Sequence, residues 1–138
     1  MSNHLLTTIV ILGLVAILFL ATYIQGKTVS HKRKDRIYTS LDELENQVKS
    51  EDMYARRDSI IRLDNLLAKA LRIRLNNQKD CGENLKNAKN MFTKNLYQNL
   101  WKVHKIRNDI VHRDRDIDYE EATYAYRIYK LGIKRILK

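Results

Sequence analysis

The chain has 138 residues, no proline, four glycines and a formal net charge of +10. This length allows one domain and a short appendage, and so few turn-forming residues argue against a hairpin-rich β fold. The fold class that we predict is therefore all-α. The basic surplus favours an anionic partner, such as RNA, DNA or acidic lipid, but it does not choose among them, and a plain lysine-rich surface remains an alternative.

The single cysteine, Cys81, excludes an intramolecular disulfide and a cysteine-rich metal site. It lies in the polar stretch Asn-Gln-Lys-Asp-Cys-Gly, and we interpret it as a loop residue without a nucleophilic role. The sequence has no His-Glu-x-x-His pattern, no paired cysteines and no glycine-rich phosphate loop. We therefore expect neither a metal ion nor a cofactor.

The N-terminal part of the chain is apolar. Twenty residues, Leu5 to Ile24, carry no charge, and about 20 apolar residues are needed for a helix to cross the hydrocarbon core. A buried core helix is seldom apolar on every side. A cleaved signal peptide has a shorter apolar run with its positive charges in front. Here the charges follow the run, so we predict that residues 1–26 form an uncleaved transmembrane anchor.

The charges on either side of this anchor predict its orientation. Before the apolar run, the only side chain that can carry a positive charge is that of His4. Five cationic residues follow the run, namely Lys27, Lys32, Arg33, Lys34 and Arg36. The positive-inside rule then places the N-terminus outside and the C-terminal domain in the cytoplasm of a single-pass protein of the inner or plasma membrane. We expect residues 27–38 to be a basic juxtamembrane linker that is attracted to anionic lipid.

Apolar periodicity predicts a four- to five-helix bundle over residues 39–138. Ser40 and Glu43 spell a capping box for a first helix that breaks near residues 49–50. Further helices are expected over 53–76, 83–92 and 94–111, with a loop over 77–83 and a charged turn over 113–118. Asp118 is the predicted cap of the last helix, which ends near residue 137.

One apolar stripe runs along this last helix, and Gly132 lies within the helix as a point where another helix could approach closely. We interpret the tyrosines of the helix as core or dimer contacts rather than as platforms for stacking bases, because they recur at helical spacing. The stripe consists of Tyr119, Ala122, Tyr126, Tyr129, Ile133 and Ile136.

The helix over 94–111 contains an anomaly. At about 100° per residue, Leu96, Leu100, Val103 and Ile110 share one face, and Arg107 falls in the middle of that face. A cation in an apolar stripe is costly unless it is paired or lies in a cleft. Asn108 and His112 are four residues apart and share a side, whereas Arg107 and His112 converge only at a helix end or across two facing copies.

The sequence Arg107-Asn108-Asp109-Ile110-Val111-His112 resembles the Arg-x(4–6)-His signature of the HEPN superfamily, in which a polar residue follows the arginine. The helical surroundings over about 50–138 resemble that family too. The resemblance implies a HEPN-like helical bundle that forms a homodimer, with two motifs facing one cleft. It also implies a metal-independent endoribonuclease of a toxin or defence system, with a possible antitoxin or regulatory protein as partner. The expected products are a 2′,3′-cyclic phosphate and a 5′-hydroxyl.

Carried over to this chain, the resemblance assigns catalysis to Arg107, Asn108 and His112. His112 would be the general acid/base, Arg107 would stabilise the charge of the transition state, and Asn108 would orient the histidine or the phosphate. His104, Arg113 and Arg115 are candidate RNA contacts. For the two arginines the alternative is a solvated turn, paired with Asp114 and Asp116.

Two other functions compete with the nuclease. One is a HEPN-like module that only dimerises or binds RNA or a protein partner while tethered to the membrane. The other is a membrane-bound adaptor unrelated to the family, in which Arg107 would be neutralised by an acid of the same chain such as Asp64.

Overall fold

The structure is a computed structural model that describes residues 2–27 and 30–138. Within these residues it contains helices and no strand, which confirms the all-α prediction. The chain divides into two compact units, Met1–Ser30 and His31–Lys138, and each is described by itself.

The first unit is the helix α1, Asn3–Lys27. Its segment Asn3–Gln25 is long and apolar enough to cross a membrane, and its 23 residues extend about 35 Å at the usual helical rise. The hydroxyls of Thr7 and Thr8 donate to the carbonyls of Asn3 and His4 at 2.7 and 2.8 Å. These polar side chains therefore need no water, as a membrane-spanning helix requires.

The second unit begins with α2, His31–Val48. The prediction of a linker over residues 27–38 is wrong from His31 onward, and the predicted helix start at Ser40 is wrong too; residues 28 and 29 lie outside the described residues. The physical reason is Ile37, which is fully buried one turn before Leu41 and extends the apolar stripe of α2 towards the N-terminus.

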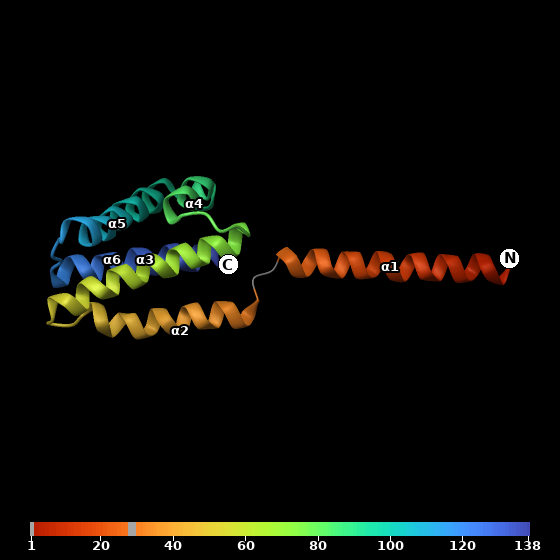
Figure 1. Cartoon of the computed structure of the whole chain (residues 1–138), viewed down its shortest axis with the longest axis horizontal. Coiled ribbons are helices and arrows are strands. Elements are labelled where there is room, and N and C mark those ends of the chain that lie inside the picture. Colours follow the sequence, from red (N-terminus) through yellow and green to blue (C-terminus); the bar gives the residue numbers. More distant parts are fainter. Residues whose placement is uncertain (1, 28–29) are drawn as a thin grey trace. The chain divides into compact units, whose positions relative to one another are not determined.

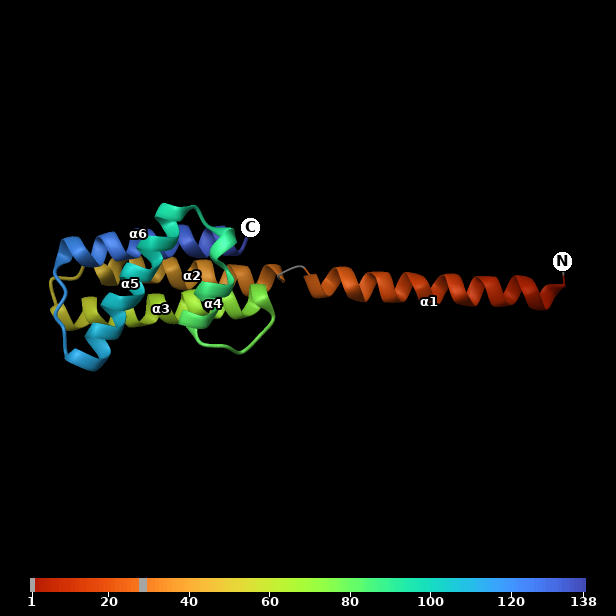
Figure 2. The same cartoon turned by 90° about the horizontal axis from the view of Figure 1, so that it is seen from above.

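Four more α-helices complete the bundle: α3 Met53–Leu75, α4 Cys81–Asn87, α5 Lys94–Arg113 and α6 Tyr119–Ile136, with a short 3₁₀ turn at Lys89–Met91. α3 and α6 lie side by side in the middle, α2 covers one side of this pair, and α4 and α5 cover the other (Figure 1). Seen from above, α5 crosses over α3 and α6 at an angle (Figure 2). α3 contacts all four other helices, so it is the centre of the unit.

Most predicted helix boundaries are confirmed. Asp52 caps α3 by accepting a hydrogen bond from the Tyr54 amide at 2.9 Å, so the chain does break after Val48. Asp118 caps α6 by accepting from the Glu121 amide at 2.8 Å, as predicted. Unpaired amides at a helix start need such acceptors, which is why the boundary signals are readable in the sequence.

The charged turn after α5 is fixed to α3 by two arginines. Arg57 pairs with Asp114 and Asp116, and the Arg56 Nε donates to the Ile117 carbonyl at 3.0 Å. These contacts hold the end of α5 and the start of α6 against the middle of the bundle.

The stripe of α6 forms its packing face, as predicted, except that Tyr119 is half exposed. Tyr126 and Tyr129 are buried, which confirms their interpretation as core residues. Gly132 faces Leu100 of α5 so closely that a Cβ at this position would lie 2.6 Å from the Leu100 Cδ2. The prediction of a close helix approach at Gly132 is therefore confirmed.

We expect Gly132→Ala to destabilise the fragment 31–138 by about 1–3 kcal/mol, because the new Cβ would overlap the fully buried Leu100 side chain and force it to shift. Gly82→Ala is the matched control, since its Cβ would meet no atom closer than 3.6 Å. Urea unfolding followed by circular dichroism measures both. Equal stability of the two variants would contradict the close packing of α5 on α6.

Candidate functional site

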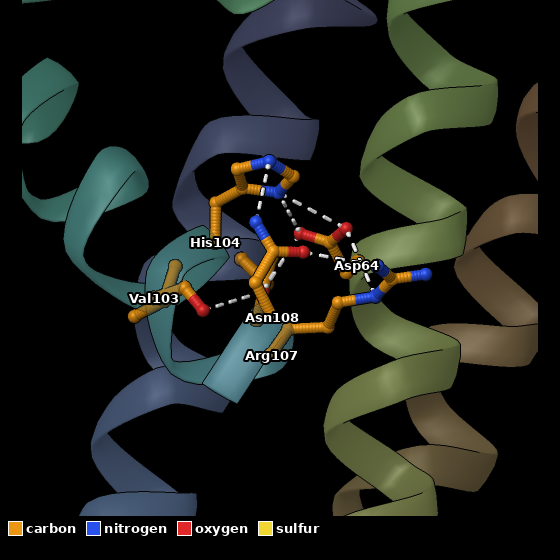
Figure 3. Close-up of polar contacts among 6 residues, drawn as sticks. Asp64, Val103, His104, Arg107 and Asn108 are labelled. Atoms are coloured by element: carbon orange, nitrogen blue, oxygen red, sulfur yellow. Dashed lines mark hydrogen bonds and ion pairs between the residues drawn. The ribbon is translucent and has the colours of Figure 1, made fainter. Parts of the chain in front are cut away.

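The site is organised around Asp64, a carboxylate of α3 that is only 2% exposed. The Tyr129 hydroxyl of α6 lies 2.9 Å from Asp64 Oδ1, and the His104 Nδ1 of α5 lies 2.9 Å from the same oxygen (Figure 3). A buried carboxylate is tolerated only when it is paired and hydrogen-bonded. Burial, together with the charge of Asp64, raises the pKa of Tyr129 well above its ordinary value, so the hydroxyl keeps its proton and acts as a donor.

Arg107 extends from the next turn of α5 towards the same carboxylate. Its Nε lies 3.7 Å from Asp64 Oδ2, which is an ion-pair distance but too long for a hydrogen bond. This Nε is buried and has no hydrogen-bond partner within the described residues. One quarter of the Arg107 side chain is nevertheless exposed.

Asn108 closes a ring of polar contacts with these residues. Its Oδ1 accepts from the Arg107 Nη1 at 3.0 Å, and its Nδ2 lies 3.4 Å from the His104 Nε2. We call Asp64, His104, Asn108 and Arg107 the polar ring, and Figure 3 shows its members meeting between α3 and α5.

The contacts of the polar ring determine its hydrogen positions. An ionised Asp64 can only accept, so the proton of a neutral His104 lies on Nδ1 and the lone pair lies on Nε2. That lone pair accepts from the Asn108 amide, whose oxygen in turn accepts from Arg107. Exchanging the two ends of the Asn108 amide would break both contacts, so a single assignment satisfies the ring.

A cavity of about 280 Å³ opens beside the polar ring, between α3, α4 and α5. It brings two guanidinium groups and an imidazole to one place, together with carboxylates that offset part of their charge. An anion that enters can therefore meet donors from several side chains. The cavity is lined by the polar ring and, among others, by Arg72, Asp80 and Cys81.

The structure brings Arg107 and Asn108 together, but it leaves the other predicted catalytic residue apart. His112 is exposed near the end of α5, and among the described residues no hydrogen bond or ion pair joins it to Arg107 or Asn108. His104, which we expected only as an RNA contact, takes the position beside Arg107 instead.

The two other candidate RNA contacts lie on the turn outside the cavity. Arg113 pairs with Asp109 at 3.7 Å, and Arg115 pairs with Glu121 at 2.6 Å. Their pairing with Asp114 and Asp116, the alternative considered from the sequence, is wrong because those acids pair with Arg57.

Sequence reasoning missed the role of Tyr129 and considered Asp64 only as a neutralising acid. A signal for Asp64 was present, because it falls between Leu63 and Leu67 on the buried stripe of α3. A carboxylate in that position needs donors from the neighbouring helices.

Cys81 differs from its prediction as a loop residue: it is the first residue of α4 and is buried. Ligand atoms of Asp64, Cys81 and His104 lie within 4.8 Å of one another, a spacing that a metal ion could bridge. A metal ion there would have to replace the His104 proton that Asp64 accepts and would lie close to the Arg107 cation. The observed contacts therefore suit a proton shared between His104 and Asp64, and an anion beside Arg107, better than a metal ion.

Comparison of the chain with protein-family models, with characterised proteins and with solved structures found no match.

The thiol of Cys81 should resist alkylation in the native chain. Burial is the main cause that raises the pKa of this thiol, so almost no thiolate is present at pH 8. We expect iodoacetamide to label native protein at least about tenfold more slowly than urea-unfolded protein, in which the thiol has its ordinary pKa. Because the chain has one cysteine, mass spectrometry reads this site alone. Equal rates would contradict the burial of Cys81.

Proposed function

We propose that this chain is a membrane-anchored, metal-independent endoribonuclease and that Arg107 binds the phosphate at which RNA is cleaved. The observation that carries the proposal is the position of Arg107. It is a partly exposed cation on an apolar helix face, it lines a cavity, and its buried Nε lacks a hydrogen-bond partner among the described residues. A phosphate oxygen in the cavity would supply an acceptor for the guanidinium.

Cleavage by attack of the ribose 2′-hydroxyl requires little beyond positioning, charge stabilisation and proton transfer. Arg107 stabilises the negative charge that develops on the phosphate oxygens, and Asn108 orients the phosphate. His112 acts as the acid/base group that the family resemblance assigns. Because His112 lies outside the cavity of its own copy, the proposal includes a homodimer in which His112 comes from the facing copy.

A second function is favoured by a specific observation. Arg107 lies 3.7 Å from Asp64, so the chain offsets part of its charge without any ligand. This contact fits a module that dimerises or binds RNA or a protein without catalysis, and it is also the contact expected of an unrelated adaptor. Yet both short bonds of Asp64 come from Tyr129 and His104, so the pairing with Arg107 is incomplete.

For localisation we propose that α1 anchors the protein in the inner or plasma membrane, with the N-terminus outside and the bundle in the cytoplasm. Support comes from the length of the apolar helix and from the cations that follow it. A toxin or defence effector, controlled by an antitoxin or another regulatory protein, fits a nuclease placed at a membrane.

The nuclease is tested with the fragment 31–138 and single-stranded RNA in EDTA. We expect wild-type cleavage to leave 2′,3′-cyclic phosphate ends, and Arg107→Ala to lower the rate about 10²–10³-fold, since it removes the charge that stabilises the transition state. His112→Ala should lower it about 10²–10⁴-fold. Arg127→Ala, which removes an exposed arginine of α6, is the matched control and should cleave as wild type does.

The oligomeric state of the same fragment is measured by light scattering. The nuclease proposal fails if a dimeric wild type cleaves none of several RNAs, or if the wild type and the three variants cleave equally. Either result would favour the non-catalytic binding module.

Orientation is tested in intact cells with a membrane-impermeant maleimide, in a Cys81→Ala background. Ser2→Cys should react from outside, and Lys138→Cys should react only after permeabilisation. Replacing Lys32, Arg33, Lys34 and Arg36 with asparagine should reduce the difference in labelling between the two cysteines. The reason is that these cations keep the C-terminal end of α1 on the cytoplasmic side of the membrane. Reaction of Lys138→Cys in intact cells would overturn the orientation.

A further inference from the structure

His104 lies where two hollows of the surface meet. It lines the cavity beside Arg107, and it also lines a neighbouring groove of about 550 Å³ along α5. Among the described residues, Asn108 is the only other one that lines both hollows. We call this second hollow the α5 groove; its walls also include Trp101, Lys102 and Lys105.

We propose that a single strand of RNA crosses α5 from the cavity to the α5 groove, and that His104 is a catalytic residue that takes the proton of the ribose 2′-hydroxyl. This inference rests on the proposed nuclease and adds to it a general base and a class of substrate. The two histidines would divide the proton transfers between them, with His112 serving the leaving oxygen.

The contacts of His104 suit a general base. Asp64 accepts from Nδ1 at 2.9 Å, which fixes the ring and leaves the lone pair on Nε2. The His104 ring packs edge-on against Trp101, with the ring centroids 5.8 Å apart. The only hydrogen bond of Nε2 among the described residues comes from the Asn108 amide at 3.4 Å, a long and weak bond that a hydroxyl can replace. When Nε2 takes a proton, the buried carboxylate stabilises the resulting imidazolium, as the aspartate does in a Ser-His-Asp triad.

The α5 groove suits an unpaired strand. Trp101 is partly exposed there and offers an aromatic surface to a base, which stacks on it only if it is not already paired within a duplex. Lys102 and Lys105 are exposed residues and can meet the phosphates that follow, although the Lys102 ammonium also lies 5.2 Å from the centroid of the Tyr124 ring. On the other side of His104, Arg72 and Arg107 provide cations for the phosphate at the cleaved bond.

The reaction step balances in atoms and charge. The 2′-hydroxyl proton moves to the His104 Nε2 while the bond from O2′ to phosphorus forms and the bond from phosphorus to O5′ breaks. Arg107 stabilises the charge on the phosphate oxygens. A proton from the imidazolium of His112 reaches O5′, so the products are a 2′,3′-cyclic phosphate and a 5′-hydroxyl. Water then restores both histidines to their starting forms.

The decisive variant is His104→Asn in the full chain, reconstituted in nanodiscs with EDTA. The new amide nitrogen can replace the Nδ1 donor to Asp64, but the group at Nε2 is gone, so the fold is retained without the base. Two substrates are compared: an RNA oligonucleotide and uridine 3′-(p-nitrophenyl phosphate), whose leaving group departs without a proton.

The two substrates separate the roles of the two histidines. We expect His104→Asn to lower the rate about 10²–10⁴-fold on both substrates, because both need the 2′-hydroxyl to lose its proton. His112→Ala should be slow on RNA but recover most of its rate on the p-nitrophenyl ester. A fall in the thermal midpoint of His104→Asn would call for His104→Gln, which must show the same pattern.

The result that overturns the inference is a His104→Asn protein that cleaves both substrates within about threefold of wild type. If Arg107→Ala and His112→Ala are then inactive, the proposed nuclease stands and only the role of His104 falls. A wild type that cleaves neither substrate overturns both proposals.

The path of the strand is measured by the fluorescence of Trp101, the only tryptophan of the chain. A 2′-O-methyl oligoribonucleotide, which cannot react, should quench it, and the duplex form should not. Lys102→Ala with Lys105→Ala should weaken binding and reduce the salt dependence by about 0.7 per lost phosphate contact. The matched control, Lys134→Ala with Lys138→Ala, removes the same charge from two exposed residues that line neither the cavity nor the α5 groove. Equal binding by both double variants would refute this path.

Discussion

The buried carboxylate of Asp64 is the interaction on which the bundle and its site both depend. It stands on α3, the central helix, and receives the Tyr129 hydroxyl from α6 and the His104 imidazole from α5. A single carboxyl group thus connects three helices that are far apart in the sequence. Leaving a charge in a helical core is unfavourable unless its donors are in place, so the native packing and the polar ring form together.

This dependence explains why the fold was easier to predict than the site. Helix type, most boundaries and the core tyrosines follow from local periodicity and capping, and these are encoded in short stretches such as Asp118 to Glu121. The prediction of a linker up to residue 38 was wrong because the charged stretch before Leu41 contains a single aliphatic residue, Ile37, which is too short a pattern to indicate a helix. Its burial depends on neighbours from other helices, which a local pattern does not contain.

For the site, the sequence predicted a cation on an apolar helix face at Arg107, and the structure places this side chain beside Asp64 and Asn108. It did not predict that His104, rather than His112, lies next to Arg107. His104 points towards α3 only because Asp64 accepts its proton there, and that pairing joins residues 40 positions apart. Helical spacing within α5 does place His104 three residues before Arg107, on the same side of the helix, but it carries no information about a partner such as Asp64 from another helix.

The close contact between Gly132 and Leu100 has a consequence for motion. Tyr129 lies three residues before Gly132 on α6, and its hydroxyl reaches the Val103 carbonyl, three residues after Leu100 on α5. The two contacts set the same register between the helices, so a slide of one turn, about 5.4 Å, would break both at once. The scaffold of the polar ring is therefore stiff along the helix axes, and any adjustment at the cavity falls to side chains such as those of Arg107 and Asn108.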